Sequence, residues 1–305
     1  MISEAQLRQY ANQTGASRTI ALQEVALTYV LGAIYAQPWS ATLAFKGGTA
    51  LRKLLFGAQG RFSVDLDFLG ARISDDDVLE IAHHLDGLSF HGLVTRIEES
   101  RFTTSDPDRF DRPTPPGFSA ACTFACELGE GALGLDVSRR RPSFLPLRRV
   151  DLVAEGYHRH LEFALPRPLA LALEESAAEK VSALARRMQH GAAKDVYDLY
   201  LYLDRPFDRP RMRRLVALTL WSDRRVIGEE DRGAIARADV RLEREDPVAI
   251  ESLELASGLF AHAPAAGVLA DRRFVRVEMQ VTALYEELRH ADFARQLAVA
   301  LDRAV

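Results

Sequence analysis

Two neighbouring segments of this chain combine residue types and spacing that favour chemistry. The first reads Lys46-Gly47-Gly48-Thr49-Ala50-Leu51-Arg52, and the second, a dozen residues later, reads Ser63-Val64-Asp65-Leu66-Asp67-Phe68. Successive side chains of a strand point to opposite faces, so the apolar residues of the second segment are expected to enter the core. Ser63, Asp65 and Asp67 would then project together from the other face.

Paired aspartates and a double glycine favour a site for a metal and a phosphate. Two adjacent carboxylates repel each other unless a cation lies between them, and hard oxygen ligands select Mg²⁺ or Mn²⁺. Gly47 and Gly48 lack Cβ atoms where a phosphate must approach, and Thr49 could cap a helix over residues 50–56 whose amino end attracts anions. A nucleoside triphosphate (NTP) would occupy both the metal site at the aspartates and the phosphate site at the glycine turn. The alternative is an ordinary turn beside a solvated strand face, but the order and spacing of the segments favour the nucleotide site.

This arrangement resembles the nucleotidyltransferase fold, in which a glycine turn precedes an Asp-x-Asp pair and a later strand supplies a third carboxylate. Within that fold, the chain is similar to the AbiEii/AbiGii and MenT-like toxins, the nucleotidyltransferase halves of toxin–antitoxin pairs. Besides the two segments above, the likeness is carried by the strand around Asp136, by Glu174-Glu175-Ser176-Ala177-Ala178-Glu179-Lys180 and by Lys194-Asp195-Val196-Tyr197-Asp198-Leu199. The family often has arginine where Lys194 stands; lysine keeps the charge but lacks the planar fork.

The resemblance implies a set of site residues. Asp136 is the third carboxylate, because Leu133, Leu135 and Val137 alternate inward around it. The metal ligands are then Asp65, Asp67 and Asp136. Lys180 and Asp195 join them as catalytic residues, with Asp195 holding Lys180 or Arg52 or accepting a proton. The expected nucleotide-binding residues are Lys46, Gly47, Gly48, Thr49, Arg52 and Ser63.

The position of Lys180 is also informative without the family. Residues 171–188 contain no glycine or proline and are rich in Ala, Leu and Glu, which predicts a helix. Leu173, Ala177, Lys180 and Leu184 lie on one stripe of that helix, so Lys180 points along an apolar face. Its ammonium could snorkel to water. Together with the upstream carboxylates, contact with a triphosphate is the better interpretation.

A second helix is predicted over residues 192–203, ending before Pro206. Val196, Leu199 and Leu203 would be buried on one face, with Asp195 and Asp198 beside it. A surface salt bridge to Lys194, four residues away, would explain Asp198.

The elements predict a two-lobed α+β protein. A nucleotidyltransferase lobe with a mixed sheet covers residues 1–166, and a helical lobe over residues 167–305 contributes Lys180 and Asp195. In the first lobe we expect a helix over residues 16–36, a helix starting at Ser74, a loop over residues 101–117, and a hairpin of residues 118–128 and 132–138 around a Gly129-Glu130-Gly131 turn. After about Pro168 the pattern is helical.

Length and composition fit this organisation. The chain has 305 residues and 48% hydrophobic content, enough for two lobes. No run approaches a membrane span, and the amino terminus lacks the blocks of a signal peptide, so no membrane contact and a cytoplasmic location are expected. The net charge of −4 argues against a generic nucleic-acid binder. However, Arg139, Arg140 and Arg141 directly follow the Asp136 strand, where an RNA could lie; solvated faces are the alternative for the other arginine runs.

These features predict transfer of a nucleotide from an NTP to an acceptor hydroxyl, with release of pyrophosphate. By resemblance the acceptor is RNA, at the 3′ end of a tRNA, and the biological role is growth arrest relieved by a cognate antitoxin. Two alternatives stay open: a nucleotidyltransferase that modifies a protein hydroxyl, and a non-catalytic nucleotide sensor that kept the fold.

Overall fold

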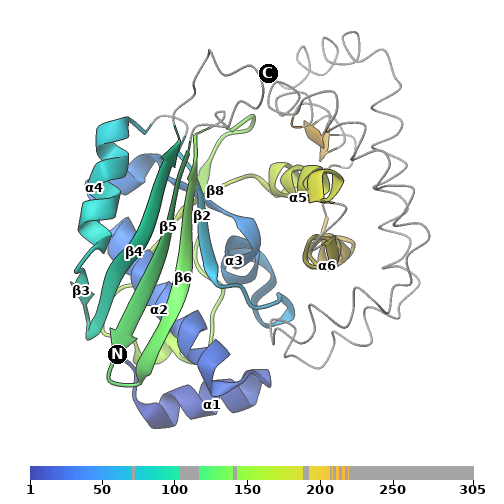
Figure 1. Ribbon diagram of the computed structural model, residues 1–305. Helices are drawn as coiled ribbons and strands as arrows, with labels where there is room; N and C mark the ends of the chain where they lie inside the picture. The colour runs from blue at the N-terminus through green and yellow to red at the C-terminus, as the bar shows by residue number, and fades with distance from the viewer. Residues whose placement is uncertain are drawn as a thin grey trace.

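The computed structural model describes residues 1–70, 73–103, 117–139, 143–187 and 192–206, together with residues 208, 211, 212, 215, 216 and 219. Within this part of the chain, eight strands form one mixed sheet in the order β3-β4-β5-β6-β2-β1-β8-β7 (Figure 1). The strands are β1 (Ala44–Lys46), β2 (Asp65–Leu69), β3 (Ser89–Phe90), β4 (Leu93–Thr103), β5 (Gly117–Cys126), β6 (Gly129–Ser138), β7 (Arg148–Arg149) and β8 (Leu169–Ala170). The α+β prediction is therefore confirmed.

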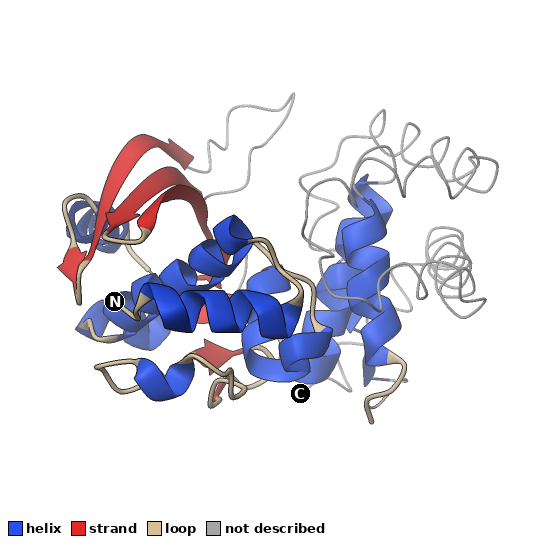
Figure 2. Ribbon diagram, turned by 90° about the horizontal axis from the view of Figure 1, so that it is seen from below, coloured by secondary structure: helices blue, strands red, loops and turns tan. Residues whose placement is uncertain are grey.

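Some helices pack against this sheet, and two others lie apart from it (Figures 1 and 2). They are α1 (Glu4–Thr14), α2 (Arg18–Tyr35), α3 (Gly47–Leu51), α4 (Asp75–Leu85), α5 (Leu173–Arg187) and α6 (Ala192–Tyr202), with short helical turns η1 (Pro38–Thr42), η2 (Arg52–Phe56), η3 (Gly57–Gln59) and η4 (His158–His160). Helices α2 and α4 contact the sheet, whereas α5 and α6 pack on each other. Figure 1 shows this pair beside α3, away from β4 and β5.

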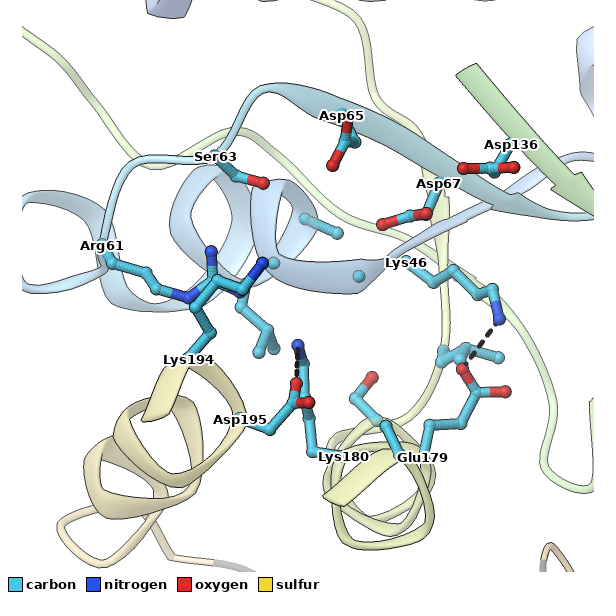
Figure 3. Close-up of a pocket in the computed structure, with 17 residues that line it drawn as sticks. Lys46, Arg61, Ser63, Asp65, Asp67, Asp136, Glu179, Lys180, Lys194 and Asp195 are labelled. Carbon is cyan, nitrogen blue, oxygen red and sulfur yellow. Dashed lines mark hydrogen bonds and ion pairs between the residues drawn. The ribbon is translucent and has the colours of Figure 1, made fainter. Parts of the chain in front are cut away.

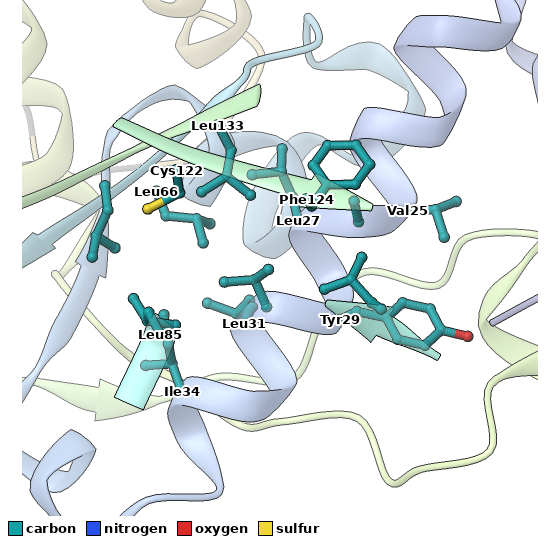
Figure 4. Close-up of a cluster of buried hydrophobic side chains, with 14 of the residues drawn as sticks. Val25, Leu27, Tyr29, Leu31, Ile34, Leu66, Leu85, Cys122, Phe124 and Leu133 are labelled. Carbon is teal, nitrogen blue, oxygen red and sulfur yellow. The ribbon is translucent and has the colours of Figure 1, made fainter. Parts of the chain in front are cut away.

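The core lies between the sheet and α2. Leu66 and Phe68 of β2 are fully buried there, as the alternation predicts, while Asp65 and Asp67 stay on the other face. Leu27 and Leu31 of α2 meet them from the helix side (Figure 4). Each such side chain contributes about 2 kcal/mol relative to an exposed position. This core fixes β2 in the register that presents both aspartates.

Local signals in the sequence give several element boundaries correctly. Ser74 caps α4 in a capping box with Asp77, which also accounts for the acidic start of that helix. Helix α2 stops before Pro38, and β5 and β6 pair as the predicted hairpin. The turn differs, however: Gly129 already pairs with Cys126, so residues 127 and 128 make the turn.

Other boundaries differ from the predictions. The helix after the double glycine begins at Gly47, not after a Thr49 cap, and it continues as the π-helical turn η2. Both ends of the predicted loop are in strands, because residues 101–103 extend β4 and Gly117 begins β5, where it pairs with Thr103. Residues 104–116 lie outside the described residues. After Pro168 the chain first adds β8, parallel to β1, before α5 begins. The division into lobes at residue 166 stays a prediction.

No helix in the described ranges is long and apolar enough to cross a membrane.

Candidate active site

A cavity of about 230 Å³ lies between the glycine turn, the aspartate strands and the amino-terminal halves of α5 and α6 (Figure 3). Most of the predicted site residues line it: Lys46, Gly47, Gly48, Ser63, Asp65, Asp67, Asp136, Lys180 and Asp195. They come from β1, α3, β2, β6, α5 and α6, except Ser63, which lies just before β2. The fold thus gathers residues separated by up to 149 positions in one cavity.

The register of β2 and β6 brings the third aspartate to the first two. The strands are parallel, with Asp67 opposite Asp136 and Asp65 opposite Gly134. Asp65, Asp67 and Asp136 therefore share the face of the sheet that points away from the core. Asp65 leans over Gly134, where a Cβ would collide with its Oδ1.

Charge crowding is strongest at Asp67. The pKa of Asp67 is raised to about 6, chiefly by burial and also by the charges of Asp65 and Asp136, while Lys46 and Lys180 oppose the shift. The three carboxylates are thus close enough to repel one another, and oxygen-only ligands of this kind suit Mg²⁺ or Mn²⁺. Across the described ranges, no three His, Cys, Asp or Glu side chains are gathered tightly enough to form a closed ligand set. The donor chemistry fits a hard divalent cation, which would draw the carboxylates together.

Lys46 faces the carboxylates from β1. Its Nζ donates to Glu179 Oε2 of α5 at 3.0 Å, and both side chains are about one-fifth exposed at 21% and 22%. This ion pair joins the sheet to the helical pair at the edge of the cavity.

Lys180 projects into the cavity from α5 and is held there by two aspartates of α6. Its Nζ lies 3.0 Å from Asp195 Oδ1 and 2.8 Å from Asp198 Oδ2. Burial alone would lower the pKa of Lys180, but Asp198 and Asp195 reverse that effect and raise it. The lysine therefore stays charged, and its ammonium does not snorkel to bulk water.

Among the residues considered in the sequence, Asp198 has surroundings that differ most from the predicted ones. Its carboxylate is buried and accepts from Lys180 and from Arg61 Nη2, the latter at 3.0 Å, so the predicted surface salt bridge to Lys194 is wrong. The buried face of α6 includes Asp195, Asp198 and Leu199, because the helix packs against α5 and the cavity. Lys194 lines the cavity itself.

Thr49 and Arg52, two of the predicted nucleotide-binding residues, are not among the cavity residues. Thr49 is buried, and its hydroxyl donates to the backbone carbonyl of Asp65 at 2.5 Å, which ties the glycine turn to β2. The Arg52 guanidinium turns into the interior, 3.4 Å from Glu24 and 3.3 Å from Glu155. The same network includes Lys53, whose Nζ is 2.7 Å from Glu24. Arg52 is therefore held by Glu24 and Glu155 and not by Asp195.

The predicted RNA-binding arginines are only partly described. Arg139 follows β6 and lies near Asp77 of α4; hydrogen bonds from Ser74 lower the pKa of that carboxyl, and the charge of Arg139 adds to the effect. It does not line the cavity. Arg140 and Arg141 lie outside the described residues.

The sequence did not predict three residues that line the cavity or contact its lining: Arg61, Glu179 and Asp198. The position of each in the sequence could have indicated it. Arg61 stands two residues before Ser63, and Glu179 precedes Lys180. Asp198 lies at helical spacing from Asp195 and Leu199, on the face that proves to be buried.

A mixed sheet that presents aspartates to a double-glycine turn, closed by a helical pair, defines the nucleotidyltransferase class. The family model described as nucleotidyl transferase AbiEii toxin, type IV TA system, matches residues 29–279. The chain therefore belongs to this family of nucleotidyltransferase toxins from type IV toxin–antitoxin systems, as the sequence predicts, and the family implies an antitoxin partner.

Among solved structures, the chain is similar to MenT4, a nucleotidyltransferase toxin from Mycobacterium tuberculosis H37Rv. The two are 27% identical with a TM-score of 0.67, and the match covers 98% of this chain and 99% of that chain. JHP933 from Helicobacter pylori matches at 18% identity and a TM-score of 0.40, over 89% of this chain and 98% of that one. A search of curated proteins found no match.

Proposed function

We propose that this toxin transfers a nucleotide from an NTP to a hydroxyl of RNA, at the 3′ end of a tRNA, and so blocks translation and growth in the cytoplasm until its antitoxin intervenes. The observation that carries the proposal is the row of aspartates beside the glycine turn. Asp67 and Asp136 face each other across β2 and β6, and Asp65 is two residues away on the same face. A transfer reaction needs charged groups concentrated where the phosphates react, and this cavity contains both carboxylates and cationic side chains.

The carboxylates and the cations would have separate tasks. Asp65, Asp67 and Asp136 would hold Mg²⁺ or Mn²⁺, which when bound lowers the pKa of the acceptor hydroxyl and stabilises charge on the leaving oxygens. Gly47 and Gly48 would let the triphosphate approach the backbone closely. Lys46 and Lys180 would neutralise its charge, with Lys180 kept protonated and aimed by Asp195.

In the proposed reaction, the acceptor oxygen forms a bond to the α-phosphorus and the bond from that phosphorus to the bridging α–β oxygen breaks. Pyrophosphate leaves with the electron pair of that bond. The hydroxyl proton passes to a cavity carboxylate and then to water. Most of the rate enhancement would come from positioning and charge neutralisation, as in phosphoryl transfer generally.

A labelled-nucleotide assay tests the proposal. The purified protein is incubated with Mg²⁺ and each NTP, labelled in turn on the α- or the γ-phosphate, together with total tRNA or with lysate protein. We expect α-label, and no γ-label, in RNA that ribonuclease destroys and protease does not. Asp67→Asn serves as the inactive control. Label in protein alone would replace the RNA acceptor by a protein hydroxyl, and no pyrophosphate with any acceptor would leave a nucleotide sensor.

A further inference from the structure

Arg61 is a buried cation of the cavity that belongs neither to the glycine turn nor to the aspartate strands. It follows η3, and only 6% of its side chain is exposed. Its guanidinium rests against Gly48, since a Cβ at that position would collide with Nη2. Nη1 donates to the carbonyl oxygen of Phe62 at 3.3 Å. The guanidinium is thus fixed beside the second residue of the turn.

Asp198 joins this arginine to Lys180. The same oxygen, Oδ2, lies 3.0 Å from Arg61 Nη2 and 2.8 Å from Lys180 Nζ. Arg61 stands on the sheet side of the cavity and Lys180 on the helical side, and both line it. One buried carboxylate therefore sets the separation between two cations that come from opposite walls.

Stability alone is a weak reason for such a cluster. The free energy lost when paired charges leave water is about as large as the free energy gained from their attraction. Apolar residues would therefore stabilise the fold equally well. A polyphosphate, in contrast, needs cations at fixed positions along its length, and an arginine fork can bind two phosphate oxygens at once. The open side of this cluster is the cavity that Lys46 and the glycine turn also line.

We infer that Arg61 binds the triphosphate at the glycine turn and that Asp198 is a positioning residue, which holds Arg61 and Lys180 at the spacing this ligand requires. The inference rests on the proposed function for the identity of the ligand. It adds a phosphate contact and a support residue that the sequence motifs do not reveal.

Binding of inorganic triphosphate with Mg²⁺ tests this without any transfer step. Titration calorimetry at a temperature well below unfolding would compare the parent with Arg61→Lys, Arg61→Gln, Asp198→Asn and Asp198→Glu. Arg167→Gln, which breaks an exposed pair with Asp151, is the matched control. The loss of a charge-assisted contact predicts binding about tenfold or more weaker for Arg61→Gln. Arg61→Lys should keep the pair with Asp198 yet bind several-fold more weakly, and Asp198→Glu should recover part of what Asp198→Asn loses.

The double variant Arg61→Gln/Asp198→Asn gives a further readout. If Asp198 acts partly through Arg61, the combined loss of affinity is smaller than the product of the two single losses. Parent-like affinity in Arg61→Lys and Arg61→Gln would overturn the phosphate contact, and a lower unfolding temperature with unchanged affinity in Asp198→Asn would make that residue merely structural. A parent protein that does not bind inorganic triphosphate would overturn the inference as a whole. The predicted pattern of affinities in a protein that transfers nothing to RNA would support the inference while the proposed function fails.

Discussion

The carboxylate of Asp67 occupies the space that a side chain at position 47 would need. A Cβ on Gly47 would overlap Oδ2 and lie 2.7 Å from Cγ of that aspartate, and Gly47 itself has a φ of +77°. The absence of a side chain at Gly47 therefore leaves the space that the Asp67 carboxylate fills, and any larger residue at position 47 would displace that carboxylate.

We expect Gly47→Ala to abolish nucleotide transfer, because Asp67 must move away from Asp136. Gly87→Ala is the matched control: Gly87 has a similar φ of +75° but nothing within 4 Å of its added Cβ. The control should lose about 1 kcal/mol from backbone strain and keep its activity. Equal activity in both variants, measured beside their urea unfolding curves, would contradict the proposed coupling.

Asp67→Asn should remove transfer and the stabilisation of the fold by Mg²⁺. A ligand that binds the folded state raises its stability with concentration, so the parent should melt at higher temperature as Mg²⁺ is added. The variant should not respond, because it lacks the central charge of the carboxylate row. Asp151→Asn, on an exposed residue, is the control. An unchanged Mg²⁺ response in Asp67→Asn would exclude this carboxylate as a ligand.

Lys180→Met should lose both turnover and stability. The substitution leaves Asp195 and Asp198 buried with one cation fewer, and breaking a buried pair from one side costs about 3 kcal/mol or more. Adding Asp195→Asn should restore much of the stability but none of the activity. Thermal unfolding and the transfer assay separate these effects; a double variant that recovers activity would make Lys180 structural.

Replacing Arg140 and Arg141 by Ala should weaken binding to tRNA and flatten its salt dependence. Each neutralised phosphate releases counterions, so every lost contact reduces the slope of affinity against salt. Affinity for free triphosphate should hardly change. Filter binding at several salt concentrations gives the slope, and a slope equal to that of the parent would remove these arginines from the RNA path.

His158 should make the fold sensitive to mild acid. Burial, aided by Lys53, lowers the pKa of His158 from 6.5 to about 4, and its Nδ1 accepts from the backbone N–H of Glu155 at 3.2 Å. The unfolded chain then binds more protons between these values, so this residue's contribution to stability is complete above about pH 6.5 and is lost as the pH falls towards 4.

Urea unfolding of the parent and of His158→Gln between pH 7.5 and 5 measures this contribution. The stability advantage of the parent should shrink as the pH falls. A substitution at the exposed His83 controls for general effects of removing a histidine. A parent-to-variant difference that stays constant over this range would rule out the linkage.

Patterns within a few residues of the sequence were sufficient to place the two aspartates of β2 and the glycine turn. The alternation of β2 placed Asp65 and Asp67 together because strand side chains point to opposite faces whatever else surrounds them. Glycine spacing located the turn, and Ser74 with Asp77 located the start of α4, because both signals act within a few residues. The family likeness added Asp136, and the parallel register of β2 and β6 agrees with it.

Only the tertiary structure decided which charges meet. Arg52 and Lys53 follow the glycine turn, yet they turn towards Glu24, while Arg61, beyond η3, lines the cavity. Asp198 reads as a surface residue from its nearest neighbours in sequence, but its partner Arg61 is 137 positions away. Helical spacing defines a face, whereas packing decides what covers that face. The partners of a buried charge therefore could not be predicted from the spacing of residues alone.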